Sequence, residues 1–283
     1  MDMETDFIEV KAYAKVNLTL DVLNKRPDGY HELEGVMQAI SVYDEVRVEK
    51  AEGITVSFDV PVPENNTCRK AAELYLAGTD LGARITVKKH IPSEAGLGGA
   101  SADGAAVLRA LNALYGLYAE DELYSIGLRV GADVPFCLMG GCAVARGVGE
   151  KLTPVNGMEL DLLIVRGPRG VSTGKLFSSL GVGTEKQSRL SENNLENVLS
   201  AIKKGDKPLL ASSLENALTP AAISLAPEIA DYIARMKKLG ALGASMTGSG
   251  AAVFGIFNSP ADAKQASVDF GPVDFKAVCR TLK

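Results

Sequence analysis

Residues 91–115 read IPSEAGLGGASADGAAVLRALNALY, and this stretch decides the fold. From Arg84 to Ile91, polar and apolar side chains alternate with the period of two that is typical of a half-buried strand. Pro92 ends that pattern, and three glycines follow it, Gly96, Gly98 and Gly99. Glycines suit a turn in which the backbone bends sharply or approaches a ligand closely. The stretch therefore predicts a strand that leads into a glycine-rich turn.

A helix is predicted after this turn. Ser101 and Asp103 provide its polar start, and apolar residues from Val107 to Tyr115 recur at the spacing of one helical face. A glycine turn that opens a helix presents N–H groups at the positive end of the helix dipole, which suits phosphate. The strand is not followed by G-x-x-x-x-G-K-[ST] or G-x-G-x-x-G. A tight strand-to-helix connection without a ligand stays open as the alternative.

Composition limits the class of protein. The 283 residues are 46% hydrophobic and 23% charged, which is ordinary for a soluble globular protein of one large or two medium domains. The net charge of −5 gives no overall basic footprint, so no nucleic-acid partner is expected. The four cysteines include no C-x-x-C pair and only two histidines are present, so no zinc site is expected.

The chain shows neither a signal peptide nor a membrane span. It begins MDMETDFIEVKAY, which is acidic, and no run approaches the roughly 18 apolar residues of a spanning helix. We therefore expect a cytoplasmic enzyme with reduced thiols and no membrane partner.

The first strand carries polar residues along one face. Every even position from Ile8 to Val22 is apolar, so the odd positions form the polar face. Lys15 and Asn17 lie on that face, about 7 Å apart along the strand. A solvated face is the plain alternative for a strand lysine.

Two further segments carry candidate side chains. Tyr30 and His31 follow a turn at residues 27–29, and they could stack on a planar ligand or pack against the sheet. Asp133 lies between a helix predicted at residues 121–130 and Pro135, which we expect to block a return to helix. Asp133 is either a turn former or a catalytic carboxylate.

The remaining elements are predicted from local pattern. Residues 36–58 predict several short strands of an antiparallel sheet, and residues 71–76 predict a helix capped within Asn65-Asn66-Thr67. Residues 142–155 predict one strand kinked at its glycines, and residues 172–177 a short helix. A helix at 227–239 and a strand, turn and strand across 243–257 complete the chain.

The pattern Pro92-x-x-x-Gly96-Leu97-Gly98-x-x-Ser101 resembles the ATP loop of the GHMP kinases, small-molecule kinases that include homoserine and mevalonate kinases. Four motifs agree with this resemblance from about Lys11 to Phe257: AKVNL with RPDGYH, GLGG with SAD, GADVP, and TGSG. Together they resemble one family member closely. Glu94, and Ala100 in place of a third consecutive glycine, are small departures from its loop.

The resemblance implies an α+β fold with two domains. The N-terminal domain is expected to resemble ribosomal protein S5, with a left-handed βαβ unit, and the C-terminal domain to be ferredoxin-like. We place these domains at residues 1–160 and 161–283.

The resemblance also implies the reaction. The protein is expected to transfer the γ-phosphoryl of ATP, with Mg²⁺, to the 2-hydroxyl of a cytidine-diphosphate-linked methylerythritol in the non-mevalonate isoprenoid pathway. Lys15 and Asp133 match the catalytic positions, and no protein ligand of the metal is assigned beyond a weak candidacy of Ser101.

Binding residues follow from the same motifs. The residues expected to bind ATP are Asn66, Pro92, Ser93, Glu94, Ala95, Gly96, Leu97, Gly98, Gly99, Ala100, Ser101, Ala102 and Asp103. Those expected to bind the substrate are Asn17, Tyr30, His31, Ser172, Thr173, Phe177, Thr247, Gly248, Ser249 and Gly250. Among these, Tyr30 and Phe177 are expected to clamp the cytosine while His31 reads its edge.

Two alternatives stay open. One is a kinase of this family for another small alcohol, such as homoserine or mevalonate, and the other is a related binding protein without catalysis. The sequence also leaves the oligomeric state open, with a homodimer as one alternative.

Overall fold

The computed structural model describes residues 6–185 and 187–283, and the chain forms two compact units. The first unit takes the chain up to Ala14, Val42–Ile91 and Gly98–Met139. The second takes Lys15–Ser41, Pro92–Leu97 and Gly140–Lys283. Two long strands, β1 (Phe7–Lys25) and β2 (His31–Ala51), contribute residues to both units.

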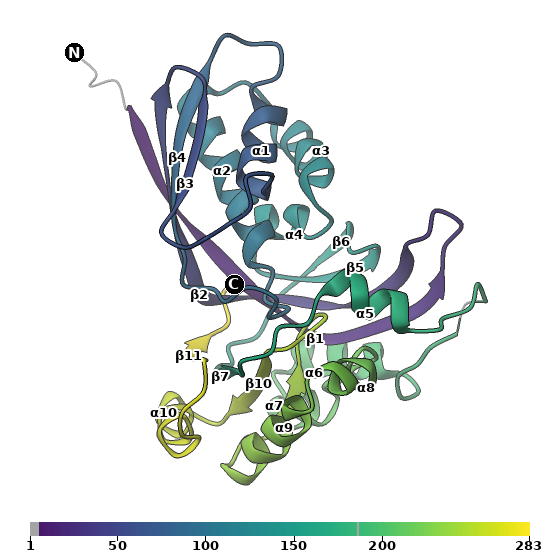
Figure 1. The fold of residues 1–283 in the computed structure, drawn as a ribbon. Coiled ribbons are helices and arrows are strands. Elements are labelled where there is room, and N and C mark those ends of the chain that lie inside the picture. The colour runs from purple at the N-terminus through teal and green to yellow at the C-terminus, as the bar shows by residue number, and fades with distance from the viewer. Residues whose placement is uncertain (1–5, 186) are drawn as a thin grey trace. The chain divides into compact units, whose positions relative to one another are not determined.

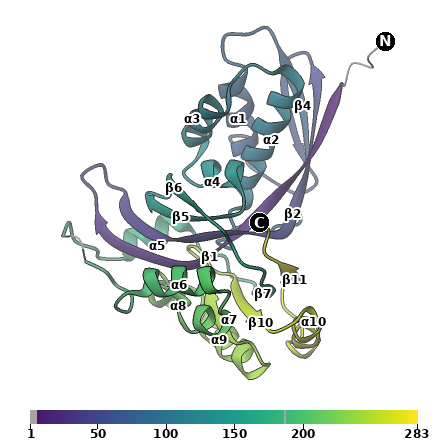
Figure 2. The same ribbon diagram turned by 180° about the vertical axis from the view of Figure 1, so that it is seen from behind.

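The first unit combines strands with four helices. Strand β4 (Gly82–Lys88) pairs in parallel with β3 (Ile54–Phe58) and antiparallel with residues 45–51 of β2. Helix α1 (Thr67–Tyr75) connects β3 to β4, so these elements form the expected βαβ unit. The helices α1, α2, α3 and α4 lie on one side of these strands (Figures 1 and 2). Their bounds after α1 are Gly99–Tyr115, Glu120–Val130 and Val134–Met139.

The second unit contains an antiparallel sheet with the strand order β11-β7-β10-β9. These strands are β7 (Asp161–Arg166), β9 (Gly243–Met246), β10 (Val253–Phe257) and β11 (Phe275–Arg280). Helix α9 (Glu228–Lys238) precedes β9, and α10 (Pro260–Asp269) connects β10 to β11. Numbered along the chain, the order is 4-1-3-2, which confirms the expected ferredoxin-like topology.

The second unit also holds shorter elements. Strands β5 (Cys142–Gly147) and β6 (Lys151–Val155) form a hairpin that pairs with β2, and β8 (Glu215–Asn216) pairs in parallel with β1. The remaining helices are α5 (Thr173–Ser179), α6 (Asn194–Lys204), α7 (Lys207–Ser212) and α8 (Thr219–Leu225).

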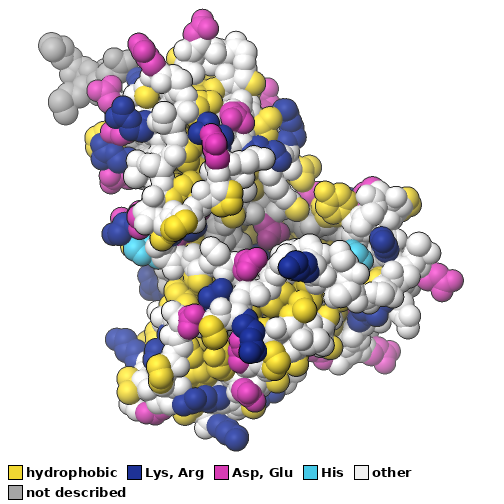
Figure 3. Space-filling view, viewed as in Figure 1, with side chains coloured by type: hydrophobic (Ala, Val, Ile, Leu, Met, Phe, Trp, Pro, Cys, Tyr) yellow, Lys and Arg dark blue, Asp and Glu magenta, His cyan; other side chains and the backbone are white. Residues whose placement is uncertain are grey.

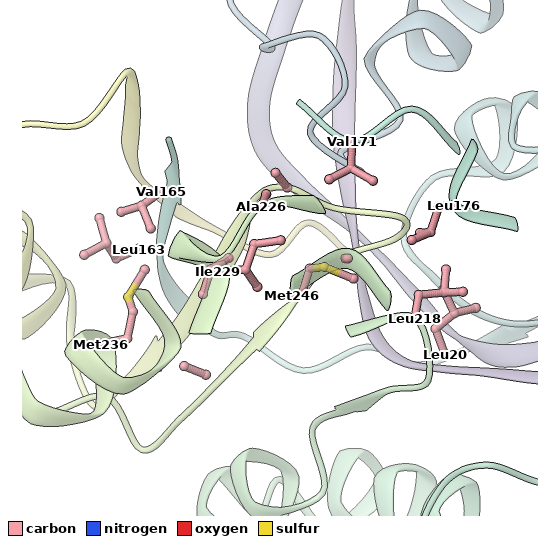
Figure 4. Close-up of a cluster of buried hydrophobic side chains, with 14 of the residues drawn as sticks. Leu20, Leu163, Val165, Val171, Leu176, Leu218, Ala226, Ile229, Met236 and Met246 are labelled. Atoms are coloured by element: carbon pink, nitrogen blue, oxygen red, sulfur yellow. The ribbon is translucent and has the colours of Figure 1, made fainter. Parts of the chain in front are cut away.

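A hydrophobic core holds the second unit together (Figure 4). Leu163 and Val165 of β7 meet Met246 of β9 and the inner face of α9, which contributes Ile229 and Met236. Each of these side chains is almost completely buried, which stabilises the fold by about 1.5–3 kcal/mol for each one. The surface in Figure 3 mixes basic with acidic side chains, so the net charge is not concentrated in one region of that face.

Two sheet predictions were wrong. Residues 31–51 form one strand instead of several, because the Asp44 side chain is satisfied inside the unit by the N–H groups of His90 and Ile91. The β3–β4 pairing is parallel because α1 intervenes and returns the chain in the same direction.

Three local predictions were also wrong. Residues 142–155 form a hairpin, since Gly147 adopts a φ of +76° where a kinked strand was expected. Pro135 does not block a helix: it lies in the first turn of α4, where a missing N–H costs nothing. Helix α2 begins after Gly98, so Ser101 and Asp103 lie within the helix and do not cap it.

Other predicted elements agree with the structure. The β1 strand, α2, α3, α9 and the strand-turn-strand at the end of the chain were all predicted, and Asn66 caps α1 by accepting the Arg69 N–H. The domain boundary at residues 160 and 161 stays a prediction.

Candidate active site

From Lys15 to Asp21, the odd face of β1 is a buried polar row. Lys15, Asn17, Thr19 and Asp21 are all at most 5% exposed, so the alternative of a solvated face is wrong. The Lys15 Nζ donates to Asn17 Oδ1 at 2.7 Å, and the Thr19 hydroxyl donates to the side chain of Asn194. Asp21 accepts hydrogen bonds from the Ser188 hydroxyl and from the Arg189 N–H. Burial of polar groups requires such partners, and this row supplies them.

Two distant segments converge on the start of this row, within the second unit. The Asn17 N–H donates to Thr247 Oγ1 at 3.0 Å, and the Lys15 N–H donates to the Leu97 carbonyl at 3.0 Å. The N–H groups of Ala251 and Ala252 donate to the carbonyls at positions 94 and 95, both at 3.1 Å. Hydrogen bonds therefore join three segments of the second unit: the Pro92–Leu97 half of the glycine loop, the Thr247–Gly250 turn and the backbone at Lys15 and Asn17.

Two glycines allow this close approach. A Cβ atom on Gly96 would lie 2.0 Å from the Thr247 carbonyl oxygen, and the Gly96 φ of +72° already disfavours other residues. A Cβ atom on Gly248 would lie 2.7 Å from the Gly96 carbonyl oxygen and 3.2 Å from Lys15 Nζ. Larger residues at either position would push the two turns apart.

The Gly98–Asp103 half of the loop belongs to the first unit and is held by charge. The Lys89 ammonium donates to the carboxylates of both Asp44 and Asp103. Burial opposes the charge of Lys89, but the two carboxylates outweigh it and raise the pKa of the ammonium. Burial and the nearby Asp44 raise the pKa of Asp103. The Thr67 hydroxyl adds a hydrogen bond of 2.6 Å to the Ala100 carbonyl.

Asp133 lies half-buried at the start of α4. Its carbonyl accepts the Cys137 N–H at 3.1 Å, and Arg109 of α2 donates to the Cys137 carbonyl at 3.0 Å. A Cβ atom on Gly131 would lie 3.9 Å from Ser101 Oγ, so the Gly131–Asp133 segment runs beside the first turn of α2. The first unit thus brings Asp133 and the helical half of the loop together.

The side chain of Asn66 is already engaged in capping. It accepts the Arg69 N–H at 3.0 Å and donates to the carbonyls of Pro63 and Glu64. These hydrogen bonds hold the side chain at the start of α1. The expected position of Asn66 near adenine stays a prediction.

The three aromatic candidates differ in how they pack, and the clamp of Tyr30 and Phe177 stays a prediction. The rings of His31 and Phe177 are in contact, with centroids 5.1 Å apart and a tilt of 34°. Tyr30 is 65% exposed. Burial, followed by the charges of Lys25 and Arg189, lowers the pKa of His31. The contacting rings of His31 and Phe177 therefore form one wall, and the Tyr30 side chain is largely exposed.

Other expected substrate residues lie in the second unit. The hydroxyls of Thr173 and Ser249 are 2.7 Å apart, so the start of α5 meets the Thr247–Gly250 turn. The Ser172 carbonyl accepts the Leu176 N–H in the first turn of α5.

Several buried polar residues around these sites were not predicted from the sequence to be functional. Thr19 and Asp21 were visible on the odd face of β1, and Asn194 and Asn216 lie in polar segments that carried no assigned role. Lys89 and Asp44 gave no signal, because their pairing joins segments far apart in the chain. Among the described residues, no group of three or more His, Cys, Asp or Glu side chains is arranged to hold a metal ion.

Family comparisons match both halves of the chain. The GHMP kinases N terminal domain matches residues 66–141, and the GHMP kinases C terminal domain matches residues 198–270. Within the described part of the chain, no helix has the length and apolar character needed to cross a membrane.

Close relatives extend this match. The chain is 42% identical over 261 residues to the 4-diphosphocytidyl-2-C-methyl-D-erythritol kinase of Carboxydothermus hydrogenoformans, covering 90% of each chain. It is also 42% identical to the enzyme of that name from Pelotomaculum thermopropionicum, covering 94% of this chain and 95% of the relative.

Solved structures agree. A crystal structure of 4-(cytidine 5'-diphospho)-2C-methyl-D-erythritol kinase superimposes with a TM-score of 0.82 at 35% identity, covering 98% of this chain and 100% of the other. Homoserine kinase from Cytophaga hutchinsonii matches with a TM-score of 0.78 at 24% identity, covering 100% of this chain and 96% of the other, a likeness of fold alone.

Proposed function

Because the chain belongs to the GHMP kinase family, we infer that it phosphorylates the 2-hydroxyl of 4-diphosphocytidyl-2-C-methyl-D-erythritol with ATP. The products are the 2-phosphate and ADP, and the reaction serves the non-mevalonate isoprenoid pathway. The observation that carries this inference is the identity of about two residues in five, over nine tenths of both chains, to kinases named for that substrate. The family and fold expected from the sequence are thereby confirmed.

The proposed chemistry is one in-line phosphoryl transfer. The 2-hydroxyl oxygen bonds to the γ-phosphorus while the bond from that phosphorus to the β–γ bridging oxygen breaks, and ADP leaves with the electron pair. Asp133 takes the proton of the hydroxyl as general base. Lys15 stabilises the negative charge on the transferring group, since such transfers depend mostly on positioning and charge.

ATP is proposed to bind along the glycine loop. The first turn of α2, from Gly99 to Ser101, presents N–H groups at the positive end of a 17-residue helix, which favours phosphate. Asn66 is proposed to lie near the adenine. When bound, Mg²⁺ neutralises charge between the β- and γ-phosphates. The partly exposed Ser101 hydroxyl suits this ion, which binds few protein ligands besides phosphate oxygens and water.

The wall formed by His31 and Phe177 is proposed to receive the cytosine. A flat base stacks on such a surface, and each stack contributes about 1–3 kcal/mol. The lowered pKa of His31 favours its neutral imidazole, which offers one ring donor and one ring acceptor to the edge of the base. Tyr30 has room to move over the base because its side chain is exposed. Asn17, Thr173 and the Thr247–Gly250 turn are proposed to hold the rest of the substrate.

An ADP-release assay with a panel of acceptors tests the function. We expect turnover with 4-diphosphocytidyl-2-C-methyl-D-erythritol and little with homoserine or mevalonate. Asp133→Asn should lower turnover by roughly two orders of magnitude or more, in line with the loss of a positioned general base. Its affinity for a non-hydrolysable ATP analogue, measured by calorimetry, should stay near that of the wild type.

Other results would favour the alternatives. Turnover with homoserine or mevalonate alone would point to another small-alcohol kinase. ATP binding without ADP release from any acceptor would point to a binding protein without catalysis. A cytoplasmic location and a homodimer stay predictions.

A further inference from the structure

We propose that Asn216 is a positioning residue for Lys15: its side-chain amide holds the Thr247–Gly250 turn in the place that fixes the lysine. Asn216 is 7% exposed and lies on β8, outside the glycine loop and outside the residues expected to bind substrate. The proposal rests on the catalytic role proposed above for Lys15, and all of its contacts lie within the second unit.

The amide of Asn216 makes hydrogen bonds through both of its N–H groups and through its oxygen. Its Nδ2 donates to the Met246 carbonyl at 3.0 Å and to the Gly248 carbonyl at 2.9 Å. Its Oδ1 accepts the Leu218 N–H at 2.9 Å. The two donated bonds bracket Thr247, so they fix the direction in which the chain enters the turn.

The Thr247–Gly250 turn also restricts the position of Lys15. A Cβ atom on Gly248 would lie 3.2 Å from Lys15 Nζ, so the backbone of the turn packs directly against the ammonium group. The Thr247 hydroxyl accepts the Asn17 N–H, and Asn17 Oδ1 accepts a hydrogen bond from Lys15 Nζ. Moving the turn therefore moves two groups that contact the lysine side chain, the Gly248 backbone and Asn17.

Asn216 is itself tied to the strand that carries Lys15. It lies opposite Leu20 in the parallel β1–β8 pairing, and the Ala217 N–H donates to the Leu20 carbonyl at 2.9 Å. The connection thus runs from β1 through β8 to the turn and back to β1. A closed connection of this kind restricts the lysine more than contact with the turn alone would.

Only an amide of this length can donate to the two carbonyls and also accept the Leu218 N–H. The two carbonyls need two N–H donors from one side chain, which asparagine provides. An aspartate would keep the acceptor for Leu218 but would present a carboxylate to two carbonyl oxygens. Asn216→Asp therefore removes the hold on the turn while it retains the size of the side chain.

Asn194 is a matched control. It is also a buried asparagine of the second unit, 6% exposed, whose side chain accepts the Thr19 hydroxyl and donates to the Ser213 carbonyl at 2.9 Å. Its bonds lead to Thr19 and Ser213 and not to the turn. Asn194→Ala should lower stability about as much as Asn216→Ala, because each change leaves buried polar groups without partners.

The experiment measures kcat, both KM values and the melting temperature for Asn216→Ala, Asn216→Asp and Asn194→Ala in the full-length enzyme. We expect kcat to fall about tenfold to a hundredfold in both Asn216 variants, because small misplacements of catalytic groups cost rates of this size. The KM for ATP should change less than about threefold, and Asn194→Ala should keep kcat within about threefold of the wild type. Equal kcat in the Asn216 and Asn194 variants would overturn the proposal.

A double-mutant cycle with Lys15→Met identifies the route of the effect. If Asn216 acts through Lys15, Asn216→Ala should lower kcat no further once Lys15 is replaced. An unchanged tenfold loss in that background would overturn the positioning role. If Lys15→Met alone retained wild-type kcat, the proposed role of Lys15 would be rejected instead, so the two failures are distinguishable.

Discussion

The two halves of the glycine loop are held by different forces. The Gly98–Asp103 half is anchored by buried charge, since Lys89 bridges Asp44 and Asp103. The Pro92–Leu97 half is anchored by backbone hydrogen bonds and by glycines that allow the Thr247–Gly250 turn to approach. The stability of the Gly98–Asp103 half should therefore depend on charge and pH, and that of the Pro92–Leu97 half on side-chain volume.

The largest expected effect is on the charged half. Lys89→Met would leave two carboxylates buried without their cation, which lowers the free energy of unfolding by about 3–5 kcal/mol. Chemical denaturation measures this loss. The triple variant Asp44→Asn, Lys89→Met, Asp103→Asn should recover much of it, because the buried charges are then gone. A triple variant as unstable as Lys89→Met would show that the lysine acts through packing instead of charge.

Gly96→Ala tests the other half by volume alone. Its Cβ would meet the Thr247 carbonyl oxygen at 2.0 Å, so we expect a loss of about 1–3 kcal/mol in unfolding free energy and a rise in the KM for ATP. Gly78→Ala is the control, because Gly78 has a similar φ of +79° with nothing within 4 Å of a Cβ. Similar losses in both variants would mean that backbone strain, and not the contact with the turn, explains the effect.

The pH dependence of stability should come in part from the charged half. Folding raises the pKa of Asp103, so this carboxyl binds a proton more readily in the folded state than in the unfolded chain. In the unfolded chain it titrates at about 3.9. The contribution of this group to stability is therefore present at low pH and declines as pH rises from that value to the raised folded value. Asp103→Asn should remove this decline from denaturation curves measured across the range. An identical pH profile in the variant would contradict the assignment.

The smallest effects should come from single hydroxyls in the two halves. Thr67→Val removes one hydrogen bond to the Ala100 carbonyl and should cost about 1 kcal/mol in unfolding free energy. Thr247→Val removes the acceptor of the Asn17 N–H as well as a donor to the Gly96 carbonyl, so it should cost more and also lower kcat. If Thr67→Val lowered kcat by the same factor as Thr247→Val, the expected difference between the two halves of the loop would be contradicted.

The sequence predicted those features that depend on neighbouring residues. The β1 alternation, the glycine turn, α2 and the strand-turn-strand before Phe257 each carry a local signal, and the structure contains all of them. The resemblance in four motifs identified the family. Predictions from local pattern were wrong where partners distant in the chain determine the structure. Asp44 was expected to interrupt the strand, but it lies inside a long strand because the N–H groups of residues 90 and 91 donate to its carboxylate.

The site was predicted by motif and not by geometry. Lys15, Asn17 and Thr247 were selected from separate motifs, and the structure joins them through hydrogen bonds. Asn216 could not be found from sequence because its role depends on carbonyl groups of residues 246 and 248, which every sequence possesses. The wall of His31 and Phe177 likewise depends on packing between segments far apart in the chain.

The interleaved path of the chain has a consequence for gene recombination. Each compact unit is assembled from three separate stretches, and β1 and β2 pass from one unit to the other. A single crossover between two homologous genes at a position before residue 139 would exchange parts of both units, and a later one would divide the second unit. A chimera that takes one whole unit from each parent would therefore need several breakpoints, placed near residues 14, 41, 91, 97 and 139.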